Sequence, residues 1–289
     1  MTRRRLPRWL RSGRVLVGGS IVVIAIICAV CAPLLAPHDP QVQELLYTNL
    51  PPAWVVGGDP QFFLGTDSIG RDVLSRLIYG TRVALYVAFL GGFSTMILGG
   101  TLALVAGYLG GWLDWIVSRA VELWMAFPPI VLSLILMVGL GVGVNNVVLA
   151  IVLVDWTRFA RVLRADVLVV TKRDYIAAAR LAGFTHFQIF RRELLPAVRP
   201  LLITMLSLEM AIAVIVEAIL SFVGQSVEAT VPAWGIMIAD ARLHMYENVW
   251  ALLFPFFAIF LLVLAFNLLG DGLRRTLDPK LQRNQRIEA

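Results

Sequence analysis

Charge is scarce in this sequence of 289 residues, and lysine is almost missing. Charged residues make up 15% of the chain, against about 25% in soluble domains, and the only lysines are Lys172 and Lys280. No segment reads GxxxxGKS or GxxxxGKT, so the phosphate-binding loop of P-loop nucleotide hydrolases is absent. The glycine-rich run 139–143 falls in a turn that we expect on the non-cytoplasmic side, away from nucleotide. We therefore expect no ATP hydrolysis by this chain itself, and its energy must come from a partner or an ion gradient.

Cysteine and histidine are also too few and too dispersed for metal or redox chemistry. Cys28 and Cys31 have CxxC spacing, but they lie within an apolar run and have no histidine or second cysteine pair nearby. The histidines His38, His186 and His244 are far apart in the sequence. We expect neither a metal site nor a disulfide, and we interpret the two cysteines as small buried apolar residues.

Apolar residues dominate the chain instead. They make up 59% of it, and the mean hydropathy is +0.80, more than one soluble core of this size could bury. Stretches of about 20 apolar residues cross a membrane as helices. Six such stretches occur, at 15–36, 83–107, 117–139, 145–163, 199–223 and 248–270. The sequence predicts an all-α polytopic membrane protein with six transmembrane helices, the second and third joined by a tight turn at 108–111.

The first apolar stretch is interpreted as a retained membrane anchor rather than a signal peptide, because no small-residue cleavage site precedes Pro33. Arginines gather before this stretch, within 155–199 and after Gly270, whereas the loops 37–80 and 224–247 are acidic. The positive-inside rule then places both termini in the cytoplasm of a cell inner (plasma) membrane protein. The expected divisions are a basic segment 1–14, a first span 15–36, an extracytoplasmic loop 37–82, a core 83–270 with a cytoplasmic loop 165–198, and a tail 271–289. The net charge of +6 follows from this topology, and we do not expect nucleic-acid binding.

A polar, basic, helix-prone segment at 174–196 interrupts the apolar runs. The alanine-rich stretch 174–181 favours a helix, and Gly183 supplies a break after it. Thr185 and Gln188 have the spacing of a capping box, flanked by Phe184 and Ile189 as a hydrophobic staple. A second short helix is therefore predicted from Thr185, ending before Pro196 because proline disrupts a helix interior.

The second short helix carries apolar residues at helical spacing. Phe187, Phe190 and Leu194 predict one apolar stripe on an otherwise basic segment, and such a stripe needs a partner. We interpret the segment as a docking element rather than a simple connection.

Four motifs, in order along the chain, resemble one family. Ala178-Ala179-Arg180, followed by Gly183 and then Leu195-Pro196, resembles the cytoplasmic EAA loop of bacterial ABC-importer permeases. The other three resemble signatures of oligopeptide and dipeptide permeases, and they lie at 64–76, at 217–224 with 232–235, and at 264–274 with 277–279. The chain is identified as similar to the second, C-type permease subunit of such importers, over essentially its whole length.

The resemblance implies a type I ABC importer permease fold with a coupling-helix loop. It implies a homologous permease, two cytoplasmic ATPase subunits that bind ATP and Mg²⁺, and an extracytoplasmic peptide-binding protein, with no cofactor in this chain. The residues expected to couple it to the ATPases are Ala178, Ala179, Arg180, Gly183, Phe187, Phe190 and Pro196. Two positions depart from the pattern, with Ala177 in place of the motif glutamate and Glu193 in place of isoleucine. Docking is expected to depend more on the phenylalanines and arginines as a result.

Two acidic residues in the fifth apolar stretch have two possible roles. Glu209 and Glu217 either line the transport path, as path or gate residues that attract a peptide ammonium group, or pair with groups on neighbouring helices. Glu122 lies one helical turn from Arg119, and local pairing is expected there.

The motif at 64–76 is open to two interpretations as well. Asp67 or Ser68 caps a short amphipathic helix in which Asp72 and Arg76 pair at i,i+4, which makes the segment a folded surface loop. Alternatively, Asp67, Arg71, Asp72 and Arg76 contact the binding protein.

Two functional alternatives remain beside a peptide importer. The same kind of importer carries nickel or glutathione in related systems. An ion-coupled secondary transporter would instead need an inverted repeat and broken helices, neither of which the sequence indicates.

Overall fold

Helices form nearly all of the structure, a computed structural model that describes residues 12–277. They are α1 (Gly13–Val30), α2 (Ala32–Leu35), α3 (Val73–Leu109), α4 (Gly111–Met125), α5 (Pro129–Leu140), α6 (Val144–Thr171), α7 (Asp174–Leu181), α8 (His186–Ile189), α9 (Leu195–Phe222), α10 (Trp234–Leu243) and α11 (Trp250–Leu277). A 3-10 turn η2 (Leu45–Tyr47) and a π-helical turn η3 (Phe190–Leu194) complete the set. Most of the basic segment 1–14 and of the tail 271–289 lies outside the described residues.

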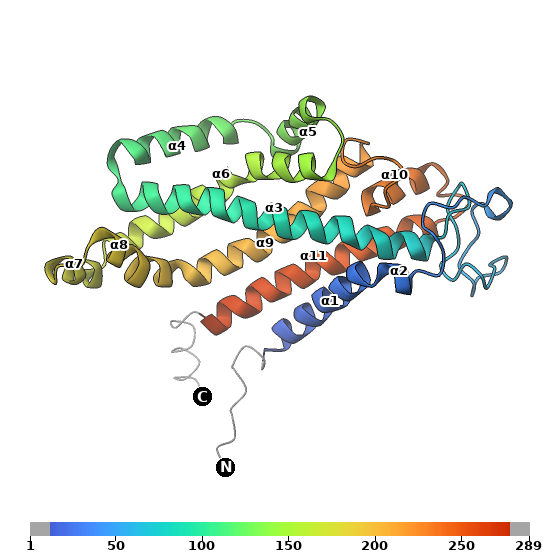
Figure 1. Ribbon diagram of the computed structural model, residues 1–289, viewed down its shortest axis with the longest axis horizontal. Coiled ribbons are helices and arrows are strands. Elements are labelled where there is room, and N and C mark those ends of the chain that lie inside the picture. Colours follow the sequence, from blue (N-terminus) through green and yellow to red (C-terminus); the bar gives the residue numbers. More distant parts are fainter. Residues whose placement is uncertain (1–11, 278–289) are drawn as a thin grey trace, which may run out of the picture.

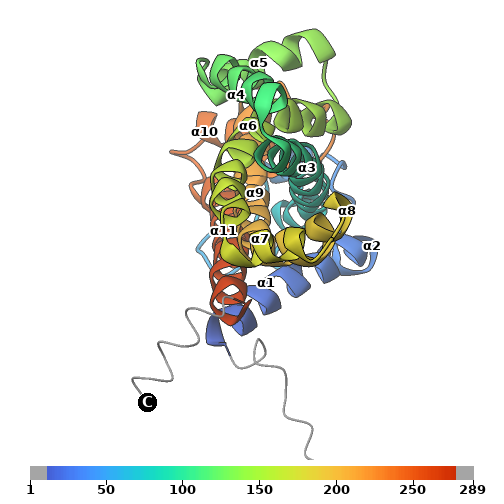
Figure 2. The ribbon, with the colours of Figure 1, turned by 90° about the vertical axis from the view of Figure 1, so that its left-hand side faces the viewer.

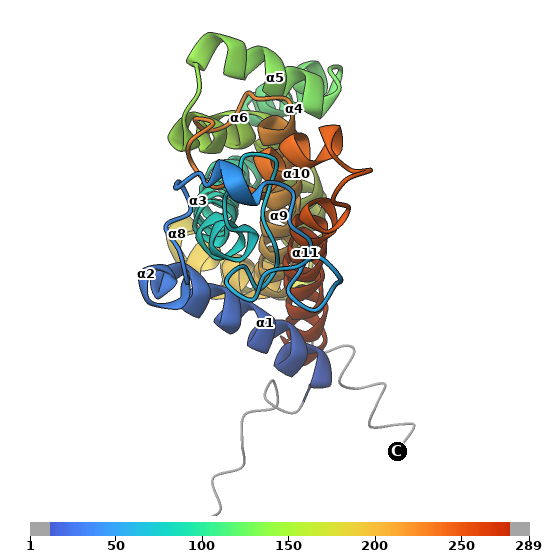
Figure 3. The same ribbon diagram turned by 90° about the vertical axis from the view of Figure 1, so that its right-hand side faces the viewer.

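The long helices run roughly side by side, and the two ends of this bundle differ (Figure 1). At one end lie α7 and α8, and Figure 2 looks onto this end. The end of α11 and the start of α1 point toward the same end but lie farther in along the long axis (Figure 1). Arg14 of α1 and Asp271 of α11 lie 3.7 Å apart there. The loop 37–72 and α10 cover the opposite end, seen in Figure 3. The regions expected in the cytoplasm and outside it are thus separated along the long axis.

The expected six straight spans are only partly found. Within the described residues, four helices are long and apolar enough to cross a membrane: Gly13–Val30, Val73–Leu109, His186–Phe222 and Trp250–Thr276. The predicted span 117–139 is instead the pair α4 and α5, bent by 88°. The bend falls at Pro128 and Pro129, because proline restricts the residue before it and cannot continue a helix. The expectation of no broken helix is wrong at this point.

The predicted span 145–163 lies within α6. This helix is long enough to cross a membrane, but it carries too many charged residues to count as a membrane span by composition. Asp155, Arg158, Arg161 and Arg164 all lie on it. The structure therefore has four such spans, or five if the bent pair crosses the membrane once.

Helix α3 lies at the centre and packs most extensively against α6. Glycine makes this approach possible, since a Cβ on Gly99 would lie 2.5 Å from the Trp156 carbonyl oxygen and 2.9 Å from the Phe159 Cβ. Small residues let membrane helices pack backbone to backbone in this way. The tight turn predicted at 108–111 is confirmed, with Gly110 and Gly111 both at positive φ.

Two features outside the centre differ from expectation. Helix α3 begins at Val73, ten residues before the predicted span, so that the motif at 64–76 runs directly into it. Cys28 and Cys31 are free and only half-buried, because α1 lies at the outside of the bundle (Figure 1).

The contact between α3 and α6 gives a first testable prediction. Gly99→Ala should lower the thermal unfolding midpoint of the purified protein, because the added methyl group overpacks the interface at a cost of about 1–3 kcal/mol. Gly139→Ala is the matched control, since no atom lies within 4 Å of a Cβ at that helical position. Equal midpoints for the two variants would contradict the close packing at Gly99.

Candidate functional site

The segment 174–196 lies at one end of the bundle and contains α7, α8, the turn η3 and the start of α9 (Figure 2). Helix α7 ends at Leu181, and Gly183 has φ +82°, so the break predicted at this glycine is confirmed. The capping box is also confirmed. The backbone N–H of Thr185 donates to Gln188 Oε1 at 2.9 Å, and that of Gln188 donates to Thr185 Oγ1 at 3.3 Å.

Tyr108, at the end of α3, holds these two helices in place. Its hydroxyl lies 2.9 Å from His186 Nδ1 of α8, and the Arg180 guanidinium of α7 lies 5.9 Å from the centre of its ring. Tyr108 also packs against the small buried cluster of Ile176, Ala179 and Ile189. From the sequence, Tyr108 was only part of a turn, and nothing in the local pattern indicates this role.

The predicted apolar stripe does not form one surface. Phe187 is 69% exposed, whereas Leu194 is fully buried and Phe190 packs half-buried against the cluster between α3, α6 and α9. The prediction of a common exposed stripe is wrong because Phe190 and Leu194 pack into the bundle, whereas none of the described helices covers Phe187 at its end. In the π-helical turn η3, the Leu195 N–H donates to the Phe190 carbonyl, five residues back.

Pro196 does not end the second helix, in contrast to the prediction. Helix α8, the turn η3 and α9 form one continuous helix from His186 to Phe222. The π-helical turn just before Pro196 changes the hydrogen-bond register, and this accommodates a residue that has no N–H to donate.

The apolar groups presented outward by this segment are few. They are Leu181 (91% exposed), Phe187 (69%) and Tyr175 (43%), which we term the coupling surface. Burial, and then the charge of Glu193, raises the pKa of the Tyr175 phenol, so it stays neutral. Leu181 was not among the expected coupling residues, and only its exposure in the structure shows that it belongs to this surface.

The other expected coupling residues divide into two groups. Ala178, Arg180 and Gly183 are exposed, as is Ala177 at the position of the motif glutamate. Ala179 is buried and Pro196 is half-buried, so these two residues contribute to the packing of the segment rather than to its exposed surface.

Glu209 of α9 pairs with α6 inside the bundle. Its carboxylate accepts from Arg158 at 2.9 Å, and the same guanidinium lies 3.1 Å from Asp155. Glu209 and Asp155 are both buried, and Glu209 Oε1 has no hydrogen-bond partner. Two carboxylates therefore share one arginine, so pairing with a neighbouring helix, the second interpretation, describes the geometry of Glu209.

Glu217 lies near the C-terminal end of α9 and is almost fully buried. It accepts hydrogen bonds from Ser221 at 2.6 Å and Ser226 at 3.2 Å. The Ser226 carbonyl in turn accepts from the Gly143 N–H at 2.7 Å. Glu217 thus joins α9 to the loop after it and to the start of α6, which is a structural arrangement.

The motif at 64–76 lies at the opposite end of the bundle (Figure 3). Its charged side chains form a buried polar cluster. Arg71 donates to Asp67 at 2.6 Å and to Asp240 of α10 at 2.9 Å. Arg76 is only 1% exposed, with its Nε 3.8 Å from Asp67.

Asp72, rather than Asp67 or Ser68, caps the helix of this motif. Its carboxylate accepts from the Ser75 N–H at 2.8 Å at the start of α3. The predicted pairing of Asp72 with Arg76 is not found, because Arg76 turns toward Asp67 instead. All four charged residues of the motif are buried in the chain. The folded-loop interpretation fits this burial, whereas a direct contact of these side chains with a binding protein does not.

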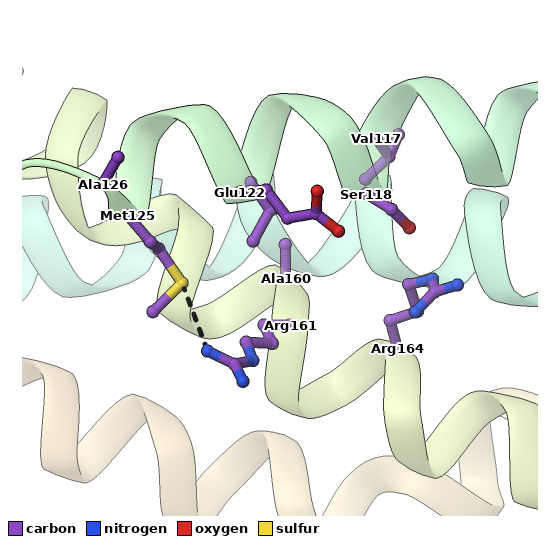
Figure 4. Close-up of a pocket in the computed structure, with 9 residues that line it drawn as sticks. Val117, Ser118, Glu122, Met125, Ala126, Ala160, Arg161 and Arg164 are labelled. Atoms are coloured by element: carbon purple, nitrogen blue, oxygen red, sulfur yellow. Dashed lines mark hydrogen bonds between the residues drawn. The ribbon is translucent and has the colours of Figure 1, made fainter.

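A polar hollow of about 360 Å³ lies between α4 and α6, and no sequence pattern indicated it (Figure 4). Ser118, Glu122 and Met125 face it from α4, and Arg161 and Arg164 from α6. The expected local pairing of Glu122 with Arg119 is confirmed.

Comparison with known proteins places this geometry in a family. Residues 99–283 match the family of binding-protein-dependent transport system inner membrane components, and residues 2–52 match the N-terminal transmembrane domain of oligopeptide transport permease C. The chain belongs to this permease family. It is therefore a membrane permease subunit of an ABC importer, and not the ion-coupled secondary transporter of the alternative interpretation.

Curated relatives cover most of the chain. It is 41% identical to the dipeptide transport system permease protein DppC of Escherichia coli (strain K12), over 94% of this chain and 91% of that protein. It is 38% identical to the di/tripeptide permease DppC of Pseudomonas aeruginosa (strain UCBPP-PA14), over 92% and 88% of the two chains. It is also 38% identical to the glutathione transport permease GsiD of Pectobacterium atrosepticum, over 95% and 90%.

The permease fold is also seen in a solved structure. A chain of the MetNI methionine ABC transporter, in an inward-facing conformation, superposes with a TM-score of 0.60 at 21% identity, covering 71% of this chain and 97% of that one. The chain thus has the fold of type I ABC importer permeases. The EAA-loop resemblance falls on the segment that carries the coupling surface.

The two phenylalanines of the segment give the second prediction. Phe190→Ala should destabilise the protein by about 2–4 kcal/mol, because it removes an aromatic ring packed between three helices. Phe187→Ala should leave stability nearly unchanged, because that ring is exposed. Thermal unfolding of both purified variants measures the difference, and equal midpoints would show that the predicted common stripe was right.

Proposed function

We propose that this permease imports short peptides. The support is its family, the dipeptide and di/tripeptide permeases among its relatives, and above all a coupling surface held firmly on the end of α3. In this proposal it forms a path with a homologous permease, and an extracytoplasmic binding protein delivers the peptide. Two cytoplasmic ATPase subunits bind ATP and Mg²⁺, and this chain holds no cofactor.

The coupling surface would insert into a cleft on an ATPase subunit. Leu181 and Phe187 are apolar and largely exposed, so their burial against a partner is favourable by about 1.5–3 kcal/mol each. The exposed Ala177 leaves the interface without the motif glutamate, so apolar contact contributes a larger share of the binding.

Movement of α7 and α8 would reach the bundle by two routes. Tyr108 connects both short helices to α3, and the unbroken helix from His186 to Phe222 connects α8 to the membrane core. Closure of the ATPases on ATP would then shift α3 and α9 together and open the path outward. Hydrolysis would reset it.

This mechanism requires α7, α8 and both termini to be in the cytoplasm. The basic residues before α1, in 155–199 and after Gly270 support that orientation. The buried cluster of Asp67, Arg71 and Asp240 would then lie outside, beneath the binding protein.

Glutathione is the second candidate cargo, because the glutathione permease GsiD is about as similar to this chain as the peptide permeases are. Glutathione is itself a tripeptide-like molecule, so both cargoes share the peptide carboxylate. Uptake of labelled Ala-Ala and of glutathione into proteoliposomes that contain the four-subunit complex, each with its loaded binding protein, distinguishes the two.

The third prediction tests the coupling surface. In the reconstituted complex, Phe187→Ala combined with Leu181→Ala should lower ATPase stimulation by the loaded binding protein at least about tenfold, because two buried apolar contacts are lost. Leu243→Ala, at a position 72% exposed on α10 at the far end, is the matched control. Normal stimulation in the double variant would contradict docking through this surface, and ATPase subunits that fail to co-purify with the wild type would contradict the proposed assembly.

A further inference from the structure

The hollow between α4 and α6 contains an arginine without an acidic partner. Arg164 pairs with Asp114, and Arg119 pairs with Glu122, so each of these guanidinium groups is neutralised. Arg161 is exposed and has no ion-pair partner within residues 12–277. Its guanidinium donates one hydrogen bond there, to the Met125 sulfur at 3.8 Å (Figure 4). One positive charge in the hollow is left uncompensated.

The depth of Arg161 makes this charge costly. Helix α6 has 28 residues and is about 42 Å long, roughly 12 Å longer than the hydrocarbon layer. Arg161 lies ten residues, or about 15 Å, from Thr171 at the end next to the coupling segment. Even if all the excess length projected at that end, Arg161 would still lie at hydrocarbon depth. An arginine there faces a wet path or an anion.

A second unsatisfied group lies in the same hollow. The Ser118 hydroxyl is buried and has no hydrogen-bond partner, and it lies opposite Arg164, whereas the Arg161 guanidinium lies beside Met125 (Figure 4). A buried hydroxyl without a partner costs about 1–3 kcal/mol. A polar, anionic ligand that extends along the hollow from Arg161 to Ser118 would satisfy both groups.

The charge balance reverses one helical turn away. There, Asp155 and Glu209 share the single guanidinium of Arg158, and Glu209 Oε1 has no partner. Arg158 and Arg161 are three residues apart, or about 4.5 Å along the axis. The excess carboxylates are buried between α6 and α9 and do not line the hollow, so they do not neutralise Arg161.

We propose that the hollow between α4 and α6 is a peptide subsite in the transport path, in which Arg161 binds the peptide carboxylate and Ser118 binds a further polar group of the peptide. The hollow is of a size typical of small-molecule sites, about 300–1,000 Å³. This proposal rests on the proposed function. It adds that the permease itself, and not only the binding protein, recognises the free carboxylate of the peptide.

The experiment uses the assembled four-subunit complex in nanodiscs, with the dipeptide alanyl-photoleucine delivered by its loaded binding protein. After illumination, mass spectrometry locates the adducts on this chain. The expected adducts lie on α4 or α6 beside Val121 and Met125, which line the hollow. Arg161→Gln should lower their yield at least about tenfold, as expected for loss of a charged hydrogen bond, while Arg161→Lys retains most of it.

Arg119→Gln is the matched control, because Arg119 is an exposed arginine on the same helix pair that is already paired. Its adduct yield and its stimulated ATPase activity should both equal those of the wild type. Adducts elsewhere, or an unchanged yield in Arg161→Gln, would overturn the subsite.

Failure of Arg161→Gln to assemble with the second permease, followed by size-exclusion chromatography, would also overturn it, because Arg161 would then pair with an acid of that neighbour. The proposed function fails in a different way: the wild-type complex would then show neither peptide uptake nor ATPase stimulation.

Discussion

An arginine within a membrane needs an anion, and this requirement determines how α6 sits in the bundle. Arg164 joins α6 to α4 through Asp114, and Arg158 joins it to α9 through Glu209. These charges are partly or fully removed from solvent and need their partners, so each pair acts as a cross-link between helices that apolar packing alone would leave free to slide. Helix α6 is thus the element through which the bent pair α4–α5 and the long helix α9 keep their mutual positions.

The two ends of the bundle are built on different principles. At the coupling end, two short helices are bound by one tyrosine and a small apolar cluster, so their outer faces stay available. At the other end, the charges of the 64–76 motif are turned inward to hold the loop 37–72 on α10 and on the start of α3. The end with α7 and α8 thus leaves apolar side chains free for a partner, whereas the end with the loop 37–72 and α10 uses its charges to fix its own fold.

Local chemistry was predictable from the sequence, but long-range contacts were not. The capping box at Thr185, the break at Gly183 and the turn at 108–111 depend on residues a few positions apart, and all three are found. The burial of Phe190 depends on the packing of helices remote in sequence, which hydrophobic spacing does not reveal. The unpaired charge of Arg161 in the hollow depends on which arginines pair with acidic residues of other helices. The spacing of residues along one helix does not predict those pairs.

The continuous helix from His186 to Phe222 has a mechanical consequence. Its 37 residues span about 55 Å, so a single helix carries Phe187 near one end and Glu209 and Glu217 toward the other. A tilt of about 5° about one end displaces the other end by about 5 Å, nearly a full helical pitch. A rotation small enough to leave every hydrogen bond of the helix intact is therefore large enough to exchange one set of side-chain neighbours for the next.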